Sequence, residues 1–179
     1  MRPPLRALLA LAAVLVAAGL VAMGCAEEEG LDVVEGEPVE LGSVEYNVQI
    51  TRFLNPTDPE DAAYLENQPK LPPGDAWLAV FMTVENMGDE PAKVPDEFDI
   101  VDTRDNTYKS VERDNPFALV PGSEVGPGEE VPAPDTPAAS GPIKGAMVLF
   151  QVPEGVTENR PLELEIPTSE GTGRVELDI

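Results

Sequence analysis

Histidine is absent from this chain of 179 residues, and cysteine occurs once, at Cys25. Histidine is the commonest general base, a common zinc ligand and the usual side chain of a pH switch, so its absence removes the simplest catalytic and metal-binding arrangements. A single cysteine excludes a disulfide within the chain. Once its first segment is set aside, the chain has room for one domain, which is large enough to bury a core without a disulfide or a metal.

Basic residues are also scarce, because 11 Lys and Arg stand against 34 Asp and Glu, a net charge of −23. Such a chain lacks the positive surface that neutralises phosphates, so we expect no nucleic-acid partner. The simplest consequence of the acidity is solubility through mutual repulsion. A surface that attracts cations or steers a partner is the alternative explanation.

The first 24 residues have the pattern of an export signal. Arg2 and Arg6 precede residues 7–23, which are uncharged and rich in Ala, Leu and Val, and the run ends in VAMGC at Cys25. A small residue directly before a lone cysteine at this point resembles the lipobox of bacterial lipoproteins. The resemblance implies that Cys25 carries a lipid that anchors the protein on the extracytoplasmic face of the bacterial cell membrane. An uncleaved anchor and ordinary secretion remain as alternatives.

The sequence therefore divides into three parts: a lipoprotein signal peptide at 1–24, a tether at 25–42 and a folded domain at 43–179. The tether is predicted to be flexible because it is acidic, self-repelling and interrupted by glycines and Pro38.

The domain is predicted to be all-β, because segments with apolar residues at every second position recur along it. Residues 77–86 form the longest such run and are expected near the middle of a sheet. Residues 102–106 are expected to form a hairpin turn, 61–67 one or two helical turns, and 115–142 a proline-rich irregular loop. The pattern favours a two-sheet antiparallel β-sandwich. The strands are expected at 44–51, 77–86, 97–101, 107–109, 145–153, 161–167 and 174–179.

Trp77 and Phe81 are the candidate partner-binding residues. Leu78, Val80 and Met82 on one face of their strand are explained by the sandwich core, but Trp77 and Phe81 lie on the opposite face. Either a segment of this chain covers them, 55–74 or the proline-rich loop, or they form an exposed patch for a partner.

Three aspartates in and after the predicted hairpin strand, Asp99, Asp102 and Asp105, are weak candidates for calcium ligands. Their spacing does not match a 12-residue EF-hand loop, so a solvated hairpin is the preferred interpretation and we expect no metal or other cofactor. Catalytic residues are not expected either, since no serine lies in a nucleophile-elbow or Ser-x-x-Lys context.

Several motifs, in order, resemble the domain of unknown function 4352. They are PGDAWLAV at 73–80 followed by TVEN at 83–86, FDIVD at 98–102 followed by Tyr108, and GAMVLFQVP at 145–153. Asn106 stands nearest to the glycine of the family's hairpin. The resemblance implies an immunoglobulin-like β-sandwich, typical of lipoproteins of Gram-positive bacteria and related to a mycobacterial secreted immunogenic protein fold, without established catalytic residues.

These observations predict a surface-anchored, non-enzymatic lipoprotein with an immunoglobulin-like binding or accessory module. Its expected partners are the membrane, through lipidated Cys25, and an envelope or extracellular protein. The alternatives are a spacer lipoprotein of the envelope without a specific ligand, and an extracellular cation-binding sensor.

Overall fold

The computed structural model describes residues 32–112 and 115–179. The predicted signal peptide, Cys25 and the first part of the predicted tether lie outside the described residues. The regular secondary structure of the described chain is almost entirely β-strand, with two short α-helices and one 3-10 helix. The elements are β1 (Asp32–Val34), β2 (Pro38–Leu41), β3 (Val44–Leu54), α1 (Pro59–Tyr64), β4 (Asp75–Asn86), β5 (Ala92–Lys93), β6 (Asp99–Val101), β7 (Thr107–Val111), β8 (Glu124–Val125), β9 (Glu130–Val131), α2 (Pro137–Ser140), β10 (Ala146–Pro153), η1 (Val156–Asn159), β11 (Leu162–Thr168) and β12 (Gly171–Leu177).

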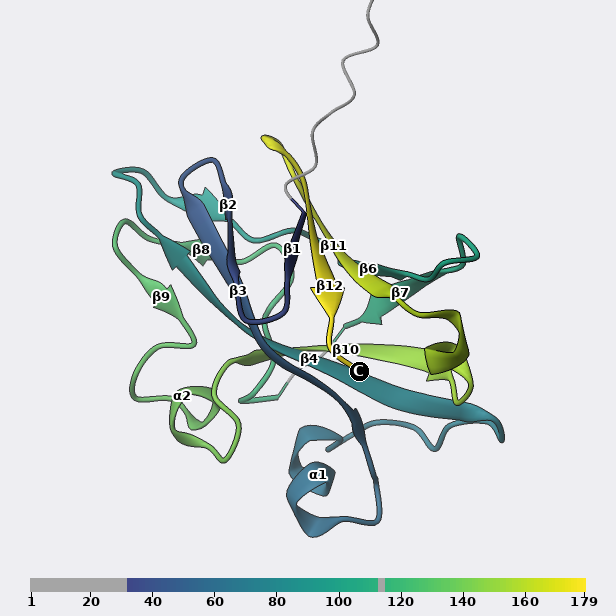
Figure 1. The fold of residues 1–179 in the computed structure, drawn as a ribbon. Helices are drawn as coiled ribbons and strands as arrows, with labels where there is room; N and C mark the ends of the chain where they lie inside the picture. The colour runs from purple at the N-terminus through teal and green to yellow at the C-terminus, as the bar shows by residue number, and fades with distance from the viewer. Residues whose placement is uncertain (1–31, 113–114) are drawn as a thin grey trace, which may run out of the picture.

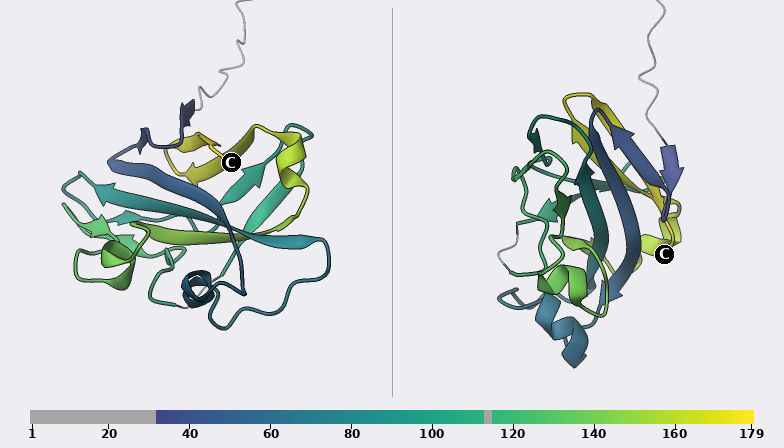
Figure 2. Two further views of the ribbon diagram at one scale, coloured as in Figure 1. Left: turned by 60° about the horizontal axis from the view of Figure 1, so that its bottom comes forward. Right: turned by 90° about the vertical axis from the view of Figure 1, so that its left-hand side faces the viewer.

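The strands form two layers that face each other across one core (Figures 1 and 2). Hydrogen bonding runs in the order β1-β12-β11-β6-β7-β10-β4-β3-β2, with β9 added to β4 and β5 paired with β8 in a separate small sheet. The β6–β7 hairpin carries the chain from the layer of β1, β12 and β11 to the layer of β10, β4, β3 and β2. This architecture confirms the predicted all-β sandwich.

Strand β4 lies where its sequence predicts, inside the larger layer between β3 and β10. Leu78, Val80 and Met82 are fully buried in the main core, and Phe81 on the opposite face is equally buried. A strand buried on both faces needs apolar residues at nearly every position, which explains its continuous hydrophobic run.

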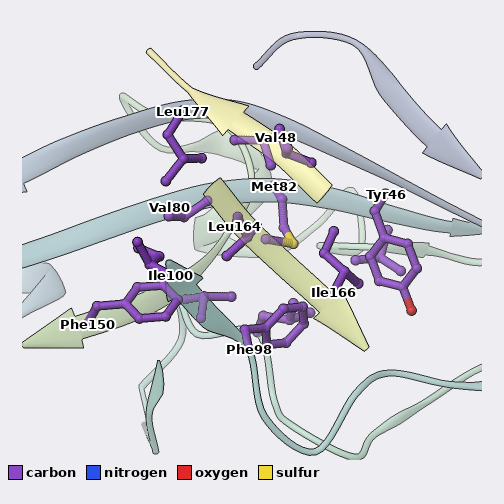
Figure 3. Packing of buried hydrophobic residues seen from close by; sticks show 14 of the residues in the cluster. Tyr46, Val48, Val80, Met82, Phe98, Ile100, Phe150, Leu164, Ile166 and Leu177 are labelled. Carbon is purple, nitrogen blue, oxygen red and sulfur yellow. The ribbon is translucent and has the colours of Figure 1, made fainter. Parts of the chain in front are cut away.

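The main core fills the space between the layers with side chains from both (Figure 3). Phe98 and Ile100, which alternation in the predicted strand 97–101 places on one face, are both fully buried there. They pack with Phe150 of β10 and Leu164 of β11, so the β6–β7 crossover is fixed to both layers.

The predicted tether is wrong over residues 32–42, because β1 and β2 belong to the sandwich. Val39 and Leu41 are buried, whereas Glu40 between them is exposed, so alternation sends the acidic side chains to solvent and the apolar ones to the core. Gly173 allows this contact, since a Cβ there would lie 3.0 Å from Leu41 Cδ1. Strand β1 pairs with β12 in parallel, so the sandwich is not purely antiparallel.

Two further segments differ in detail from their predictions. The helix begins at Pro59 rather than Asp61, because the Asp58 side chain accepts a hydrogen bond from the Glu60 backbone N–H at 2.9 Å and Pro59 suits the first turn. The proline-rich stretch 115–142 is mostly irregular, as predicted, but it contains β8, β9 and α2. No helix in the described ranges is both long and apolar enough to cross a membrane.

Candidate functional site

Trp77 and Phe81 are covered by the chain itself. Trp77 is 4% exposed and Phe81 is fully buried in a second apolar cluster on the outer face of β4. The Tyr64 ring at the end of α1 packs edge-on against Phe81, with ring centroids 5.1 Å apart, and against Phe117 at 4.7 Å. Of the two alternatives, the exposed patch is therefore wrong, and both predicted covering segments contribute to the cover.

A buried carboxylate holds α1 in this position. Asp61 is 2% exposed and accepts two hydrogen bonds from Arg52 Nη2, at 2.7 and 2.9 Å, and a third from the Asn55 backbone N–H at 2.8 Å. Because Arg52 belongs to β3, the ion pair ties the helix to the sheet. The sequence offered no signal for this pair, whose members are nine residues apart across a turn.

Trp77 lies at the base of a cleft of about 640 Å³, which we call the Trp77 cleft. Leu54, Leu65 and Leu71 line it beside the indole, and residues 68–74 form a wall rich in proline. Lys70 and Asp75 supply polar groups among the lining residues. A mainly apolar cleft of this volume with a few polar groups is typical of ligand sites.

Asp102 does not have the surroundings of a metal ligand. Its side chain is 4% exposed and accepts hydrogen bonds from the Arg104 and Asn106 backbone N–H groups, the Asn106 and Asn159 amides and the Tyr108 hydroxyl, at 2.8 to 3.2 Å. Burial alone would raise the pKa of this carboxyl, but the hydrogen bonds outweigh it and lower the pKa to about 2. The carboxylate organises the hairpin turn.

The other two aspartates do not join Asp102 in a site. Asp105 is exposed and has a φ of 61°, the left-handed conformation of the turn. The pKa of Asp99 is raised, mainly by burial. The nearby Lys109 ammonium lowers this pKa, whereas the carboxylates of Glu97 and Glu165 raise it further. Within residues 32–112 and 115–179, no three acidic or cysteine side chains are grouped so as to hold a metal ion.

A second cleft, of about 430 Å³, opens at the other end of the sandwich between its two layers. Its walls are the β2–β3 turn, the segment 91–96 and the β11–β12 turn at 167–170. Tyr46 of β3 lies at its base, and Figure 3 shows its hydroxyl directed away from the other labelled side chains. We call this the Tyr46 cleft. Alternation predicts that Tyr46 is buried, but not that it borders a cleft.

The two clefts lie far apart along the strands. Trp77 is near the start of β4, whereas Asn86 at its end pairs with Val44, which lines the Tyr46 cleft. Asn86 is nine residue steps along the strand from Trp77, a distance of roughly 30 Å. Asp32, where the described chain begins, pairs with Arg174 in the middle of β12, and β1 runs parallel to β12 away from the β11–β12 turn, so Asp32 is the residue of β1 nearest to the end with the Tyr46 cleft.

Comparison with family models and with curated proteins gives no match, so membership of the domain of unknown function 4352 is not shown. Solved structures do match. The yjhA protein of Bacillus subtilis has a TM-score of 0.54 at 15% identity, over 82% of this chain and 99% of that one. The secreted protein MPT63 of Mycobacterium tuberculosis has a TM-score of 0.51 at 11% identity, over 84% and 98%.

A third structure is ycdA of Bacillus subtilis, which is proposed to be a lipoprotein. It matches with a TM-score of 0.52 at 13% identity, over 80% of this chain and 38% of that one. At such identities the likeness concerns the fold alone. The comparisons thus show a β-sandwich fold, in keeping with the immunoglobulin-like sandwich predicted from sequence.

Proposed function

We propose that the chain is a lipid-anchored, extracytoplasmic accessory protein that binds a partner and has no enzymatic activity. The observation that carries this proposal is the Trp77 cleft, at the end of the sandwich away from the point where the described chain begins. An anchor at Cys25 would then hold one end near the membrane and leave this cleft facing outward.

The surroundings of the serine hydroxyls support a non-enzymatic role. Ser123 and Ser140 donate to backbone carbonyl oxygens at 2.8 and 2.9 Å, Ser110 accepts from the Phe98 backbone N–H at 3.0 Å, and Ser43 bonds to the Asn86 amide. In the described part of the chain, no serine hydroxyl is bonded to a lysine or a carboxylate that could activate it. These hydroxyls stabilise turns and strand ends.

The extracytoplasmic anchor is supported by the lipobox-like sequence before Cys25 and by neighbours in fold that are secreted or proposed lipoproteins. Metabolic labelling with a palmitate analogue tests it. We expect labelling and membrane association of the wild type, and loss of both in Cys25→Ser. Unchanged labelling of the variant would exclude lipidation at this residue.

The partner we propose is a segment of an envelope or extracellular protein that inserts an apolar side chain beside Trp77. The cleft is suited to this, because its lining combines the apolar side chains of Trp77, Leu54 and Leu65 with exposed Lys70 and half-buried Asp75, which can bind the backbone or a polar flank. An apolar anchor in a desolvated pocket is the usual centre of a protein interface.

Photocrosslinking on intact cells tests the cleft. A photoreactive residue at exposed Lys70 should give a discrete adduct, whereas one at exposed Thr103 in the β6–β7 turn should not. Leu71→Glu, which charges the half-buried wall, should abolish the Lys70 adduct while the fold is retained. If Lys70 gives no adduct, the spacer function, without a specific ligand, replaces this proposal.

A further inference from the structure

The Tyr46 cleft contains a buried polar group that lacks a partner. Tyr46 is 1% exposed, and no described residue donates to its hydroxyl or accepts from it. Leaving such a group unpaired costs about 1 to 3 kcal/mol. Unpaired groups of this kind are few in native proteins, so this one calls for an explanation.

The hydroxyl is suited to donate a hydrogen bond to a neutral acceptor. Burial raises the pKa of Tyr46 to about 12, so the phenol remains protonated at physiological pH. Leu41, Val44 and Val94 provide apolar surface around the ring. Among the other lining groups, Ser43, Thr168 and Ser169 are hydroxyl residues.

The charges of the cleft disfavour an anionic ligand. The Lys93 ammonium is bound to the Asp96 carboxylate at 2.8 and 3.1 Å, which leaves Glu170 as the uncompensated charge of the lining. The chain as a whole has a net charge of −23. A ligand that carries a carboxylate or a phosphate would therefore be repelled by Glu170 and by the net negative charge of the chain.

One wall of the cleft is attached weakly enough to move. The Tyr46 hydroxyl oxygen is closed off from solvent, so a ligand reaches it only when a wall shifts. Strand β5 pairs with β8 through two residue pairs, outside the ten-stranded sheet, and the segment is further held by Val94 N–H donating to Ser123 O at 2.9 Å and Gly122 N–H donating to Pro95 O at 3.1 Å. A segment with few backbone hydrogen bonds opens at a lower cost in free energy than the strands of the main sheet.

We propose that the Tyr46 cleft binds a small uncharged organic molecule that carries a carbonyl or hydroxyl acceptor on an apolar body, with the Tyr46 hydroxyl as hydrogen-bond donor. This site is separate from the Trp77 cleft and does not depend on the proposed anchor or partner. A cavity of 430 Å³ lies within the range of small-molecule sites.

Methyl NMR of the full-length chain in a lipid nanodisc tests the proposal, with 2-pyrrolidone as neutral probe and cyclopentanecarboxylate as anionic probe of similar ring size. We expect 2-pyrrolidone to shift the methyl signals of Leu41, Val44 and Val94 saturably, and to leave Leu54 and Leu71 of the Trp77 cleft unchanged. Binding of the anion should be at least tenfold weaker.

Tyr46→Phe preserves the ring and removes the donor, so it should weaken 2-pyrrolidone binding about fivefold or more, the worth of one hydrogen bond. Tyr108→Phe is the matched control, because it removes a tyrosine hydroxyl bound to Asp102, outside the cleft, and should leave binding unchanged. The proposal is overturned if 2-pyrrolidone causes no saturable shift, if Tyr46→Phe binds it as tightly as the wild type, or if the anion binds equally well.

Discussion

At the scale of single residues, the effects of Asp102 and Tyr46 depend on the hydrogen-bond partners of the Asp102 carboxylate and of the Tyr46 hydroxyl. Asp102 accepts hydrogen bonds from five donor groups, whereas the Tyr46 hydroxyl has no partner among the described residues. Both side chains are buried. They therefore affect stability in opposite directions.

Asp102 should make stability depend on acid pH. Its pKa in the folded state, about 2, is below the ordinary 3.8, so its contribution is present above about pH 4 and is lost as pH falls toward 2. The shift corresponds to about 2 kcal/mol. We expect Asp102→Asn to lower the free energy of unfolding by about this amount at pH 7, and by less at pH 2.5, in urea titrations.

Asp105→Asn is the control for this measurement. Asp105 is exposed and has a positive φ, which asparagine also tolerates, so its free energy of unfolding should stay within about 0.5 kcal/mol of the wild type at both pH values. If the difference in free energy of unfolding between the wild type and Asp102→Asn is as large at pH 2.5 as at pH 7, the lowered pKa of Asp102 is not its cause.

Tyr46→Phe should stabilise the ligand-free protein, because it removes an unpaired buried hydroxyl without creating a cavity. A gain of about 1 kcal/mol would raise Tm by roughly 2–4 °C for a chain of this size. Tyr108→Phe should lower Tm instead, since its hydroxyl donates to Asp102 at 3.1 Å. Differential scanning calorimetry of both variants distinguishes the two effects, and a lower Tm for Tyr46→Phe would mean that its hydroxyl has a partner.

Residue-scale prediction from the sequence was limited by the lack of spatial information. Alternation located Phe98 and Ile100 correctly, because burial in a strand follows directly from period 2. Asp99, Asp102 and Asp105 are candidate calcium ligands by sequence alone, because a sequence shows carboxylates but not the hydrogen-bond donors around them. The residue with positive φ in the turn is Asp105, and not Asn106, which stands nearest to the glycine of the family's hairpin.

At the scale of elements, α1 covers the outer face of β4. The helix is only six residues long, so it cannot be stable by itself and depends on Tyr64 and Asp61. The sequence predicts a helical turn at 61–67 and gives 55–74, which contains it, as one of two possible covers for Trp77 and Phe81. It does not predict the contacts of Tyr64 and Asp61 that hold the helix there, because these side-chain contacts join separate segments and leave no repeated pattern in the sequence.

Asp61→Ala should loosen this cover. It removes a buried acceptor of three hydrogen bonds, two from Arg52 and one from the Asn55 backbone, and should lower the free energy of unfolding by about 2 to 3 kcal/mol. Because Trp77 is the single tryptophan of the chain, its fluorescence reports the change directly. We expect a red-shifted emission maximum and faster quenching by acrylamide under native conditions.

Lys93→Met breaks an exposed ion pair and serves as the control, with an expected effect below about 0.5 kcal/mol and unchanged Trp77 emission. If Asp61→Ala were destabilised without any change in the emission, α1 would not be what shields Trp77.

At the scale of the whole molecule, the main difference from the sequence-based prediction concerns where the domain begins. The acidic composition of residues 25–42 predicts a flexible tether, although Val39 and Leu41 alternate with glutamate as they would in a strand. Two alternating apolar residues are too few to predict a strand in so acidic a segment. The strands form because β1 pairs with β12 and β2 pairs with β3, which the sequence pattern does not show. If Cys25 is the lipid site we propose, seven residues rather than eighteen separate the lipid from the sandwich.

Such a short connection should orient the protein. The steps from Cys25 to Asp32 span at most about 25 Å, and Asp32 lies toward the end with the β11–β12 turn. That end, with the Tyr46 cleft, should therefore stay near the bilayer, and the Trp77 cleft should lie some 30 Å farther out.

Energy transfer to acceptor-labelled lipids measures this orientation in the lipidated protein. Cys25 is the only native cysteine and would be blocked by the lipid, so a fluorophore can be attached to Ser169→Cys near the proposed membrane end or to Glu66→Cys after α1, both exposed positions. We expect much higher transfer from position 169. Inserting twenty Gly and Ser residues before Leu31 adds a flexible reach of about 25 Å and should reduce the difference. Equal transfer with the native connection would refute the orientation, whereas a protein that does not bind the membrane at all would refute the anchor instead.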